Sequence, residues 1–476
     1  MLFNSIQFAL FLPTVFLAYW FVFRKNLRGQ NLFVIVASYV FYGWWDPRFL
    51  ALIVISSGVD FFVGLQLAQA RSTARRKLLL LVSILVNLGF LGFFKYFNFF
   101  VDSLIDAVAV FGYHLEARSL NIVLPVGISF YTFQTLSYTI DVYRKKLEPT
   151  RDIVAFFAFV AFFPQLVAGP IERATNLLPQ FYVPRRFDLA TAKDGMRQVL
   201  WGLFKKIVVA DTCAVYANQI FESSEHLSGG VLILGTLYFA FQIYGDFSGY
   251  SDIAIGTAKL FGFKLMTNFR YPYFSRDIAE FWRRWHISLS TWFRDYLYIP
   301  LGGSRGSLNL KLRNTMIIFV VSGFWHGANW TFIVWGFLNG LYFLPLLLRG
   351  SNRTNLDVVA QGRLFPNLRE VLQVLATFCM TLVAWVFFRA ESVSHAITYL
   401  AGIFSSDLLV FPVAYLDKLP LVALMLAIEW PNRDKQHPLQ CGNWHPLARY
   451  AVYFGLFYLI AAFVSSDAQE FIYFQF

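Results

Sequence analysis

Long apolar runs separated by short polar connections follow one another along most of this chain. The runs from Met1 to Phe23 and from Leu78 to Phe94 contain no charged residue at all. A helix that crosses a bilayer needs about 20 mostly apolar residues, and the chain offers roughly ten to twelve such stretches. The regular alternation of polar and apolar positions that is typical of membrane β-barrels is absent. The pattern therefore predicts an all-α polytopic membrane protein.

Composition and charge agree with this class of protein. Of 476 residues, 57% are hydrophobic, 19% aromatic and only 14% charged, as expected of an integral membrane protein. Much of the formal charge of +12 lies in short basic clusters between apolar runs, at 24–28, 71–77 and 144–151. Such clusters mark cytoplasmic connections, so topology explains the charge and the lipid bilayer, not nucleic acid, is the expected partner.

The basic clusters also predict the orientation of the chain. The loop from Asp102 to Glu116 is acidic and is expected outside, which places the N-terminus outside as well. Counting the later spans places residues 471–476 on the same, outer side. The first apolar run lacks a signal-peptide cleavage pattern and is expected to be retained. No internal repeat is visible, so we predict a single membrane domain over residues 1–476.

The region between Lys193 and Arg313 is less regular, because glycine, proline and charged residues interrupt its apolar runs. Irregular backbone at membrane depth is tolerated only where protein buries it or a cavity hydrates it. We therefore expect tilted or re-entrant segments around a cavity in this region.

Two of the seven histidines, His286 and His326, have aromatic neighbours, and His326 is also flanked by glycines. Imidazole suits acyl transfer, because its ordinary pKa of about 6.5 lets it take a proton from a hydroxyl and return one to a leaving group. The neighbours Phe324, Trp325 and Trp330 should favour the neutral form of His326, which is expected to line a passage through the bilayer. A ring that only packs between helices is the alternative for either histidine taken alone.

Three residues near His326 extend this hypothesis. Gly323 and Gly327 are four residues apart, so on a helix they leave a groove where another chain segment or a substrate can approach the backbone. Asn329 is close enough in sequence to orient the His326 ring or to donate a hydrogen bond to an oxyanion. A hydrogen bond between helices is the alternative role for Asn329.

The segment from Glu280 to Tyr296 has aromatic residues at helical spacing and predicts one amphipathic helix. Between Arg270 and Arg313 there are eight Lys and Arg residues against three carboxylates. Arg283, Arg284 and Arg294 are therefore candidates for binding an anionic acyl donor, such as the phosphates of coenzyme A. An interfacial helix that touches anionic lipid is the alternative.

Asp246 and Asp252 fall within an otherwise apolar run, where carboxylates are costly and usually paired. Because six residues separate them, they point to different sides of a helix, and pairing with a nearby arginine is expected. Gly245, Gly249 and Gly256 predict close helix packing in the same run.

No metal site is predicted. His437, Cys441 and His445 are four residues apart, but Pro438 and Gly442 interrupt a common helical face. Three ligands without a fourth are a weak pattern for zinc.

Taken in order, the stretches at 32–45, 124–143, 162–173, 244–256, 281–303, 322–330 and 471–476 resemble the membrane-bound O-acyltransferase family, in its bacterial branch with the alginate O-acetyltransferase membrane subunit. The resemblance covers nearly the whole chain. It implies tilted helices around a central funnel, with His326 as the catalytic histidine near a tunnel and His286 as the second functional histidine. It also implies cytoplasmic acetyl-CoA as the acyl donor and no tightly bound cofactor.

The resemblance further implies a polysaccharide acceptor outside a bacterial inner membrane, reached through a separate periplasmic esterase-like acetyltransferase. Tyr473 corresponds to a terminal tyrosine that is proposed to carry the acyl group between the two proteins in related systems. Anchoring of the chain end in the membrane interface is its alternative role. The resulting hypothesis is that His326 deprotonates an acceptor hydroxyl, such as that of Tyr473, while His286 and Asn329 orient or stabilise the reacting groups.

Other functions stay open from the sequence alone. The chain also resembles acyltransferases that act on peptidoglycan or move D-alanine to teichoic acid. Broken helices and membrane-depth carboxylates would suit a secondary transporter, although such folds usually contain a repeat in hydropathy. A non-catalytic anchor of a secretion complex is a third alternative, which the two histidines disfavour.

Overall fold

The computed structural model describes residues 1–113, 120–404, 408, 410, 412–442, 444–464 and 471–472, which contain helices, turns and bends and no β-strand. Six helical segments are long and apolar enough to cross a membrane: Pro47–Gln69, Thr73–Ala109, Gly229–Leu260, Trp330–Leu348, Leu368–Arg389 and Pro446–Phe463. The predicted all-α polytopic class is thereby confirmed. Other apolar runs form shorter helices, such as Leu419–Glu429, whose 11 residues span about 16 Å.

The described residues divide into two compact units. The first comprises Met1–Gly195 and Thr257–Met266, and the second comprises Met196–Gly256 and Thr267–Phe476. The single domain over residues 1–476 stays a prediction.

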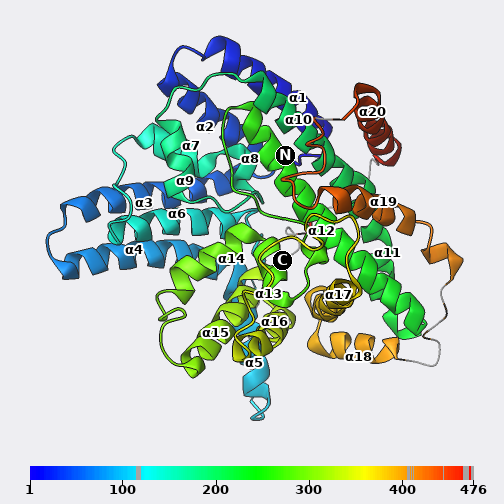
Figure 1. Ribbon diagram of the computed structural model, residues 1–476. Helices are drawn as coiled ribbons and strands as arrows, with labels where there is room; N and C mark the ends of the chain where they lie inside the picture. The colour runs from blue at the N-terminus through cyan, green and yellow to red at the C-terminus, as the bar shows by residue number, and fades with distance from the viewer. Residues whose placement is uncertain are drawn as a thin grey trace. The chain divides into compact units, whose positions relative to one another are not determined.

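The first unit is a bundle of helices in which α3, α4 and α6 pack side by side (Figure 1). Its elements are α1 (Ile6–Leu17), η1 (Ala18–Val22), α2 (Leu27–Gly43), η2 (Pro47–Phe49), α3 (Leu50–Gln69), α4 (Thr73–Leu91), η3 (Gly92–Tyr96), α5 (Phe97–Ala109), α6 (Ile128–Tyr143), α7 (Ile153–Ala161), α8 (Phe163–Leu166), α9 (Ala174–Leu177), η4 (Leu178–Phe181), the first part of α10 (Leu189–Leu203) and the last turn of α12 (Gly229–Leu260).

A buried carboxylate connects α3, α4 and α6. Asp60 is fully buried and accepts hydrogen bonds from the Ser83 hydroxyl, from Asn87 Nδ2 at 2.8 Å and from Thr139 Oγ1 at 3.0 Å. Asn87 Oδ1 in turn accepts from Ser56 Oγ at 2.6 Å. An intramembrane carboxylate is costly without such partners, so these hydrogen bonds favour one arrangement of the three helices.

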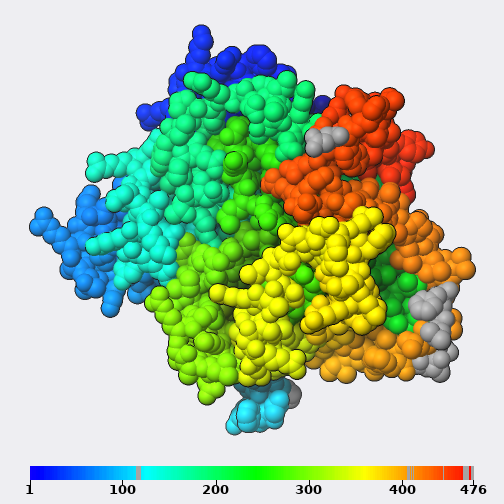
Figure 2. Space-filling view, in the orientation of Figure 1, coloured from blue at the N-terminus to red at the C-terminus, as the bar shows by residue number. Residues whose placement is uncertain are grey.

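The second unit contains the rest of the helices. They are the end of α10, the π-helical turn η5 (Phe204–Ala210), α11 (Asp211–Glu222), η6 (Ser224–His226), most of α12, η7 (Pro272–Phe274), α13 (Ile278–Arg284), α14 (Ile287–Phe293), η8 (Arg294–Tyr298), α15 (Leu308–His326), α16 (Trp330–Leu348), α17 (Leu368–Arg389), α18 (Val393–Ile403), η9 (Val413–Tyr415), α19 (Leu419–Glu429), η10 (Trp430–Asn432) and α20 (Pro446–Phe463). The connection from α16 to α17, yellow in Figure 2, forms part of the visible face of this unit.

Helices α15 and α16 form a tight hairpin because small residues let their backbones approach. A Cβ added to Gly323 would lie 2.2 Å from the Phe332 carbonyl oxygen, and one added to Gly336 would lie 2.3 Å from that of Phe319. A Cβ on Gly327 would meet the Phe332 ring at 2.0 Å. The predicted groove at Gly323 and Gly327 therefore exists, and α16 fills it, so it serves helix packing.

Candidate active site

His286 lies at a break between two short helices. The sequence predicted one amphipathic helix from Glu280 to Tyr296, but α13 ends at Arg284 and α14 begins at Ile287. His286 adopts a left-handed backbone conformation, with φ 43° and ψ 54°. A residue with a side chain rarely occupies this region, and such residues cluster at functional sites. The prediction of one continuous helix was wrong.

Asn268, outside the two helices, holds this break in place. Its carbonyl oxygen accepts the backbone N–H of Ile287 at 2.9 Å, and its side-chain Oδ1 accepts the Ser288 hydroxyl at 2.9 Å. Its Nδ2 donates to Ser251 Oγ of α12 at 3.0 Å. Aromatic periodicity predicts a continuous helix, but this buried asparagine supplies the alternative partners that make the break stable.

His326 is the last residue of α15 and lies close to His286. The centroids of the two imidazole rings are 6.2 Å apart. His326 is 3% exposed and its ring contacts those of Trp325, Trp335 and Phe388, at centroid distances of 5.0, 5.0 and 5.5 Å. The structure therefore brings the two predicted histidines together inside an aromatic cluster.

His286 is fully buried and lies outside the six candidate spans. Burial lowers its pKa to about 3, because the charged imidazolium would lose its hydration. At neutral pH the ring is therefore uncharged. A neutral imidazole has one nitrogen that can accept a proton or hydrogen bond and another that can donate.

Asn329 caps a helix. Its side-chain oxygen accepts the backbone N–H of Thr331 at 3.0 Å, and its Nδ2 donates to the carbonyl oxygen of Glu391 at 3.0 Å. These contacts fix the start of α16, directly after the turn that follows His326. The role of Asn329 towards the His326 ring or an oxyanion stays a prediction.

Two of the three candidate donor-binding arginines hold a loop. Arg283 donates to the carbonyl oxygens of Asn352 and Asn355, at 3.0 and 2.6 Å. Arg284 pairs with Glu280 at 2.8 Å within α13. Both guanidinium groups are thus engaged in fixing α13 and the connection between α16 and α17, and their role as donor-binding residues stays a prediction.

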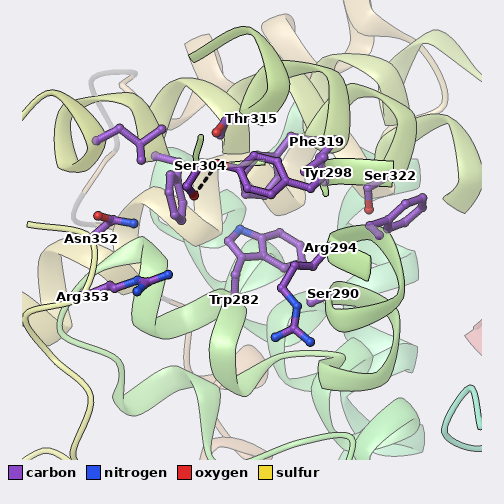
Figure 3. A pocket seen from close by; sticks show the side chains of 14 residues that line it. Trp282, Ser290, Arg294, Tyr298, Ser304, Thr315, Phe319, Ser322, Asn352 and Arg353 are labelled. Atoms are coloured by element: carbon purple, nitrogen blue, oxygen red, sulfur yellow. Dashed lines mark hydrogen bonds between the residues drawn. The ribbon is translucent and has the colours of Figure 1, made fainter. Parts of the chain in front are cut away.

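The third arginine, Arg294, lines a cavity of about 230 Å³ together with Arg353. The other lining residues, shown in Figure 3, are Trp282, Ser290, Phe293, Tyr298, Ser304, Thr315, Ile318, Phe319, Ser322, Phe343, Leu347 and Asn352. Tyr298 and Ser304 share a hydrogen bond of 3.1 Å at its edge. The walls are mostly aromatic or aliphatic, with the guanidinium groups of Arg353 and of Arg294, which pairs with Asp295 at 2.8 Å.

The cavity follows one face of α15. Ser322 lines it and precedes His326 by four residues, which is about one helical turn or about 6 Å along the axis. The imidazole of His326 is not among the lining side chains that the structure describes, so a passage that includes this ring stays a prediction. Sequence reasoning missed Arg353 because it lies in a polar loop, and only its position directly after the α15–α16 hairpin could have drawn attention to it.

The two aspartates of α12, buried Asp246 and half-buried Asp252, pair with lysines, whereas nearby arginines were expected. Lys206 Nζ lies 2.8 Å from Asp246 Oδ1, and Lys205 Nζ lies 2.6 Å from Asp252 Oδ2. The lysines are adjacent in η5, and their alkyl stems extend each ammonium to a different turn of α12.

The chain end includes the last of the predicted site residues. Tyr473 lies outside the described residues. The two residues before it, Phe471 and Ile472, are each 1% exposed, and the backbone N–H of Ile472 donates to Asp246 Oδ2 at 2.7 Å. This end of the described chain is therefore bound to α12 of the second unit.

Comparison with known proteins identifies the class. The family model of the membrane-bound O-acyltransferase family, MBOAT, matches residues 149–358, a range that contains both histidines and the cavity. The chain is 41% identical to the probable alginate O-acetylase AlgI of Pseudomonas aeruginosa, over 85% of this chain and 75% of that protein. It is 41% identical to the protein of the same name from Azotobacter vinelandii, over 90% and 83%. It is 36% identical to the peptidoglycan O-acetyltransferase of Helicobacter pylori, over 84% and 79%.

These similarities extend over most of each chain, so the protein belongs to the membrane-bound O-acyltransferase family. It is accordingly a membrane enzyme that transfers an acyl group to a hydroxyl. The alternatives of a secondary transporter and of a non-catalytic anchor are disfavoured by this membership.

Proposed function

We propose that this enzyme moves acetyl groups from cytoplasmic acetyl-CoA across a bacterial inner membrane for the O-acetylation of an alginate-like polysaccharide outside. The observation that carries the proposal is the pair of buried histidines, 6.2 Å apart between ring centroids, at the end of a helix whose preceding turns line a cavity with two arginines. The alginate-like acceptor is taken from relatives named as alginate O-acetylases.

The cavity has the chemistry that an acyl-CoA donor needs. Arg294 and Arg353 can bind phosphate groups through charge-assisted hydrogen bonds. The apolar walls formed by residues such as Phe319 and Phe343 suit the uncharged thioester arm. The arm then extends along α15 towards Ser322, about one turn from His326, while the larger nucleotide stays on the other side of the cavity, where Arg353 lies (Figure 3).

One histidine is enough to carry the proton from the acceptor hydroxyl to the leaving thiolate. His326 takes the proton of the acceptor hydroxyl, whose oxygen forms a bond to the thioester carbonyl carbon. The carbon–sulfur bond breaks, and the imidazolium returns the proton to the leaving sulfur, so that coenzyme A departs as a thiol. His286 orients or stabilises the reacting groups from the facing side. General-base assistance of this kind contributes about 10²- to 10⁴-fold in rate.

Tyr473 is the hydroxyl that we propose as the first acceptor. It directly follows Ile472, which is bonded to Asp246 through its backbone. The acetyl ester of Tyr473 then passes to a periplasmic esterase-like acetyltransferase, which delivers it to the polysaccharide. Both chain ends are periplasmic in this scheme. Peptidoglycan is the second candidate acceptor, because a relative that is 36% identical is named a peptidoglycan O-acetyltransferase.

Acetyl transfer with purified protein and radiolabelled acetyl-CoA tests the proposal. His326→Ala should abolish formation of acetylated protein and of free coenzyme A while the chain still inserts and elutes as a folded species. His395→Ala is the matched control, since this histidine contacts Ser224 at 3.1 Å and takes no part in the proposed site. Undiminished transfer by the folded His326→Ala protein would refute the assignment.

A further inference from the structure

Two adjacent lysines of η5 make parallel ion pairs with α12. Lys205 pairs with Asp252 at 2.6 Å, and Lys206 pairs with Asp246 at 2.8 Å. Both lysine side chains are less than a tenth exposed, at 3% and 8%. Both are therefore lysine–aspartate ion pairs between η5 and α12, and in both the lysine side chain is buried.

Glycines of α12 make both pairs possible. A Cβ added to Gly249 would lie 2.8 Å from the Gly202 carbonyl oxygen and 3.1 Å from the Lys206 nitrogen. A Cβ on Gly245 would lie 3.0 Å from the Lys205 carbonyl oxygen. The backbones approach closely here, as the glycine spacing predicted, and π-helical turns such as η5 are frequent at functional sites.

The pairs differ in what else their carboxylates bind. Asp252 Oδ1 accepts the side chain of Gln198 at 2.8 Å, so its second oxygen is satisfied by α10, the helix that precedes η5. Asp246 Oδ2 instead accepts the backbone N–H of Ile472 at 2.7 Å. Lys206 also reaches Asp211 at 2.9 Å, so one ammonium serves two carboxylates and Asp246 remains a strong hydrogen-bond acceptor.

Aromatic contacts lead from this anchor to the active site. The Phe471 ring lies 4.9 Å from that of Tyr250 and 6.1 Å from that of Phe247, between centroids. The Phe247 ring packs edge-on against His286 at 4.6 Å. One residue of α12 thus contacts both the C-terminal segment and the second histidine, and its neighbour Asp246 binds the backbone of that segment.

We propose that Asp246, held by Lys206, is a positioning residue that anchors the C-terminal segment Phe471–Ile472 beside His286. The inference rests on the proposed function, in which Tyr473 is the acceptor. A hydrogen bond to a backbone N–H fixes the chain direction without selecting a side chain, while the aromatic contacts fix the register. Holding a nucleophile in a productive position removes entropy from the barrier, and misplacement by about 1 Å can cost 10²-fold.

Carboxypeptidase digestion of the detergent-solubilised protein, followed by mass spectrometry, tests the anchor without any acyl transfer. In the unaltered protein, Ile472 and Phe471 should resist release, because both are 1% exposed. In Asp246→Ala both residues should be released. The same variant should lose about 10- to 100-fold in kcat for acetyl transfer, with the KM for acetyl-CoA unchanged, because the donor cavity is untouched.

A second variant removes the same hydrogen bond from the other partner. Ile472→Pro deletes the donating N–H and leaves the ion pair of Asp246 with Lys206 intact, whereas Ile472→Val keeps the N–H. The proline variant should reproduce the released segment and the lower kcat, and the valine variant should behave like the unaltered protein. This pair keeps the test decisive if Asp246→Ala fails to fold.

Asp252→Ala is the matched control, since it breaks the neighbouring ion pair on the same helix. It should leave the C-terminal segment protected and kcat within about twofold, apart from any loss of stability from the uncompensated charge of Lys205. Continued protection of Ile472 in Asp246→Ala, or release of the segment without a fall in kcat, would overturn the proposal. Release of the segment in Asp246→Ala from a protein that shows no His326-dependent transfer would support the anchor and refute only the proposed function.

Discussion

Asp60 in the first unit and Asp246 in the second are both buried carboxylates, but different groups stabilise them. Asp60 accepts hydrogen bonds from two hydroxyls and an amide on α4 and α6. Asp246 is neutralised by the ammonium of Lys206 and accepts a backbone N–H from the C-terminal segment. Neutral donors connect helices of one bundle, whereas an ion pair leaves a strongly polarised group that can bind another segment.

From this difference we expect the region around Asp60 to serve structural stability and the region around Asp246 to serve the proposed reaction. The neutral network around Asp60 needs only to be satisfied, so its expected contribution is to stability and helix arrangement. The second unit combines its ion pairs with two histidines and a cavity lined by two arginines, which are the groups that the proposed acyl transfer uses. Substitutions in the two regions should therefore change different measured quantities.

The largest predicted effect concerns His286. Asparagine tolerates the left-handed backbone that this position adopts, so His286→Asn removes the imidazole while keeping the break between α13 and α14. We expect the kcat for acetyl transfer to fall about 10²-fold, as for loss of a group that assists proton transfer or orients its partner. Steady-state kinetics with acetyl-CoA measures this change, and the thermal inactivation rate should stay close to that of the unaltered enzyme.

Comparison of His286→Ala with His286→Asn distinguishes the effect of backbone strain from the effect of losing the imidazole ring. Alanine removes the imidazole and also disfavours the left-handed conformation, so it should be slower and less stable than the asparagine variant. Full activity of His286→Asn would mean that position 286 serves the fold alone, and the contrast drawn between the two regions would then rest on His326.

The second prediction concerns Asp60. In Asp60→Asn an NH2 group replaces one acceptor oxygen, so at least one of the donors Ser83, Asn87 and Thr139 loses its partner in a buried site. We expect a loss of about 2 kcal/mol in stability, which is the cost of a buried unsatisfied polar group. Faster thermal inactivation in detergent should report it, while kcat per folded molecule stays unchanged.

Asp102→Asn is the control for the first unit, because that carboxylate on α5 is exposed. It should change neither inactivation nor turnover. A large fall in kcat for folded Asp60→Asn would contradict the division between support and chemistry, since it would give the network around Asp60 a part in the reaction.

The sequence predicted much of this organisation correctly. Apolar run lengths predicted the helical class, because backbone groups in lipid must be satisfied within helices. The glycine spacing in α12 predicted close helix packing, and that of Gly323 and Gly327 predicted a groove, because the absence of a side chain lets another segment approach the backbone. The aromatic neighbours of His286 and His326 led to the prediction that the two histidines act in one site. The 6.2 Å between their ring centroids is consistent with it.

Features that depend on remote partners were not predictable from local pattern. The aromatic stripe from Glu280 to Tyr296 has helical spacing, yet Asn268 stabilises the break at His286. Charge alone favoured arginine as the partner of Asp246, while the π-helical turn η5 directs Lys206 to it. In both cases the deciding residue is distant in the sequence, so periodicity carries no information about it.

The roles of the arginines that could bind the donor also depend on partners that are distant in the sequence. Their substitution gives the smallest predicted effect. Arg283 holds the connection that carries Arg353, and Arg353 and Arg294 both line the cavity. Arg353→Ala should therefore raise the KM for acetyl-CoA about tenfold with kcat unchanged, which corresponds to one lost, partly screened phosphate contact of about 1.4 kcal/mol. The increase should shrink at high salt, because screening already weakens an exposed contact. Arg349→Ala, which removes an exposed arginine outside the lining of the cavity, should leave the KM unchanged, and an equal increase in both variants would show that overall positive charge, not this cavity, attracts the donor.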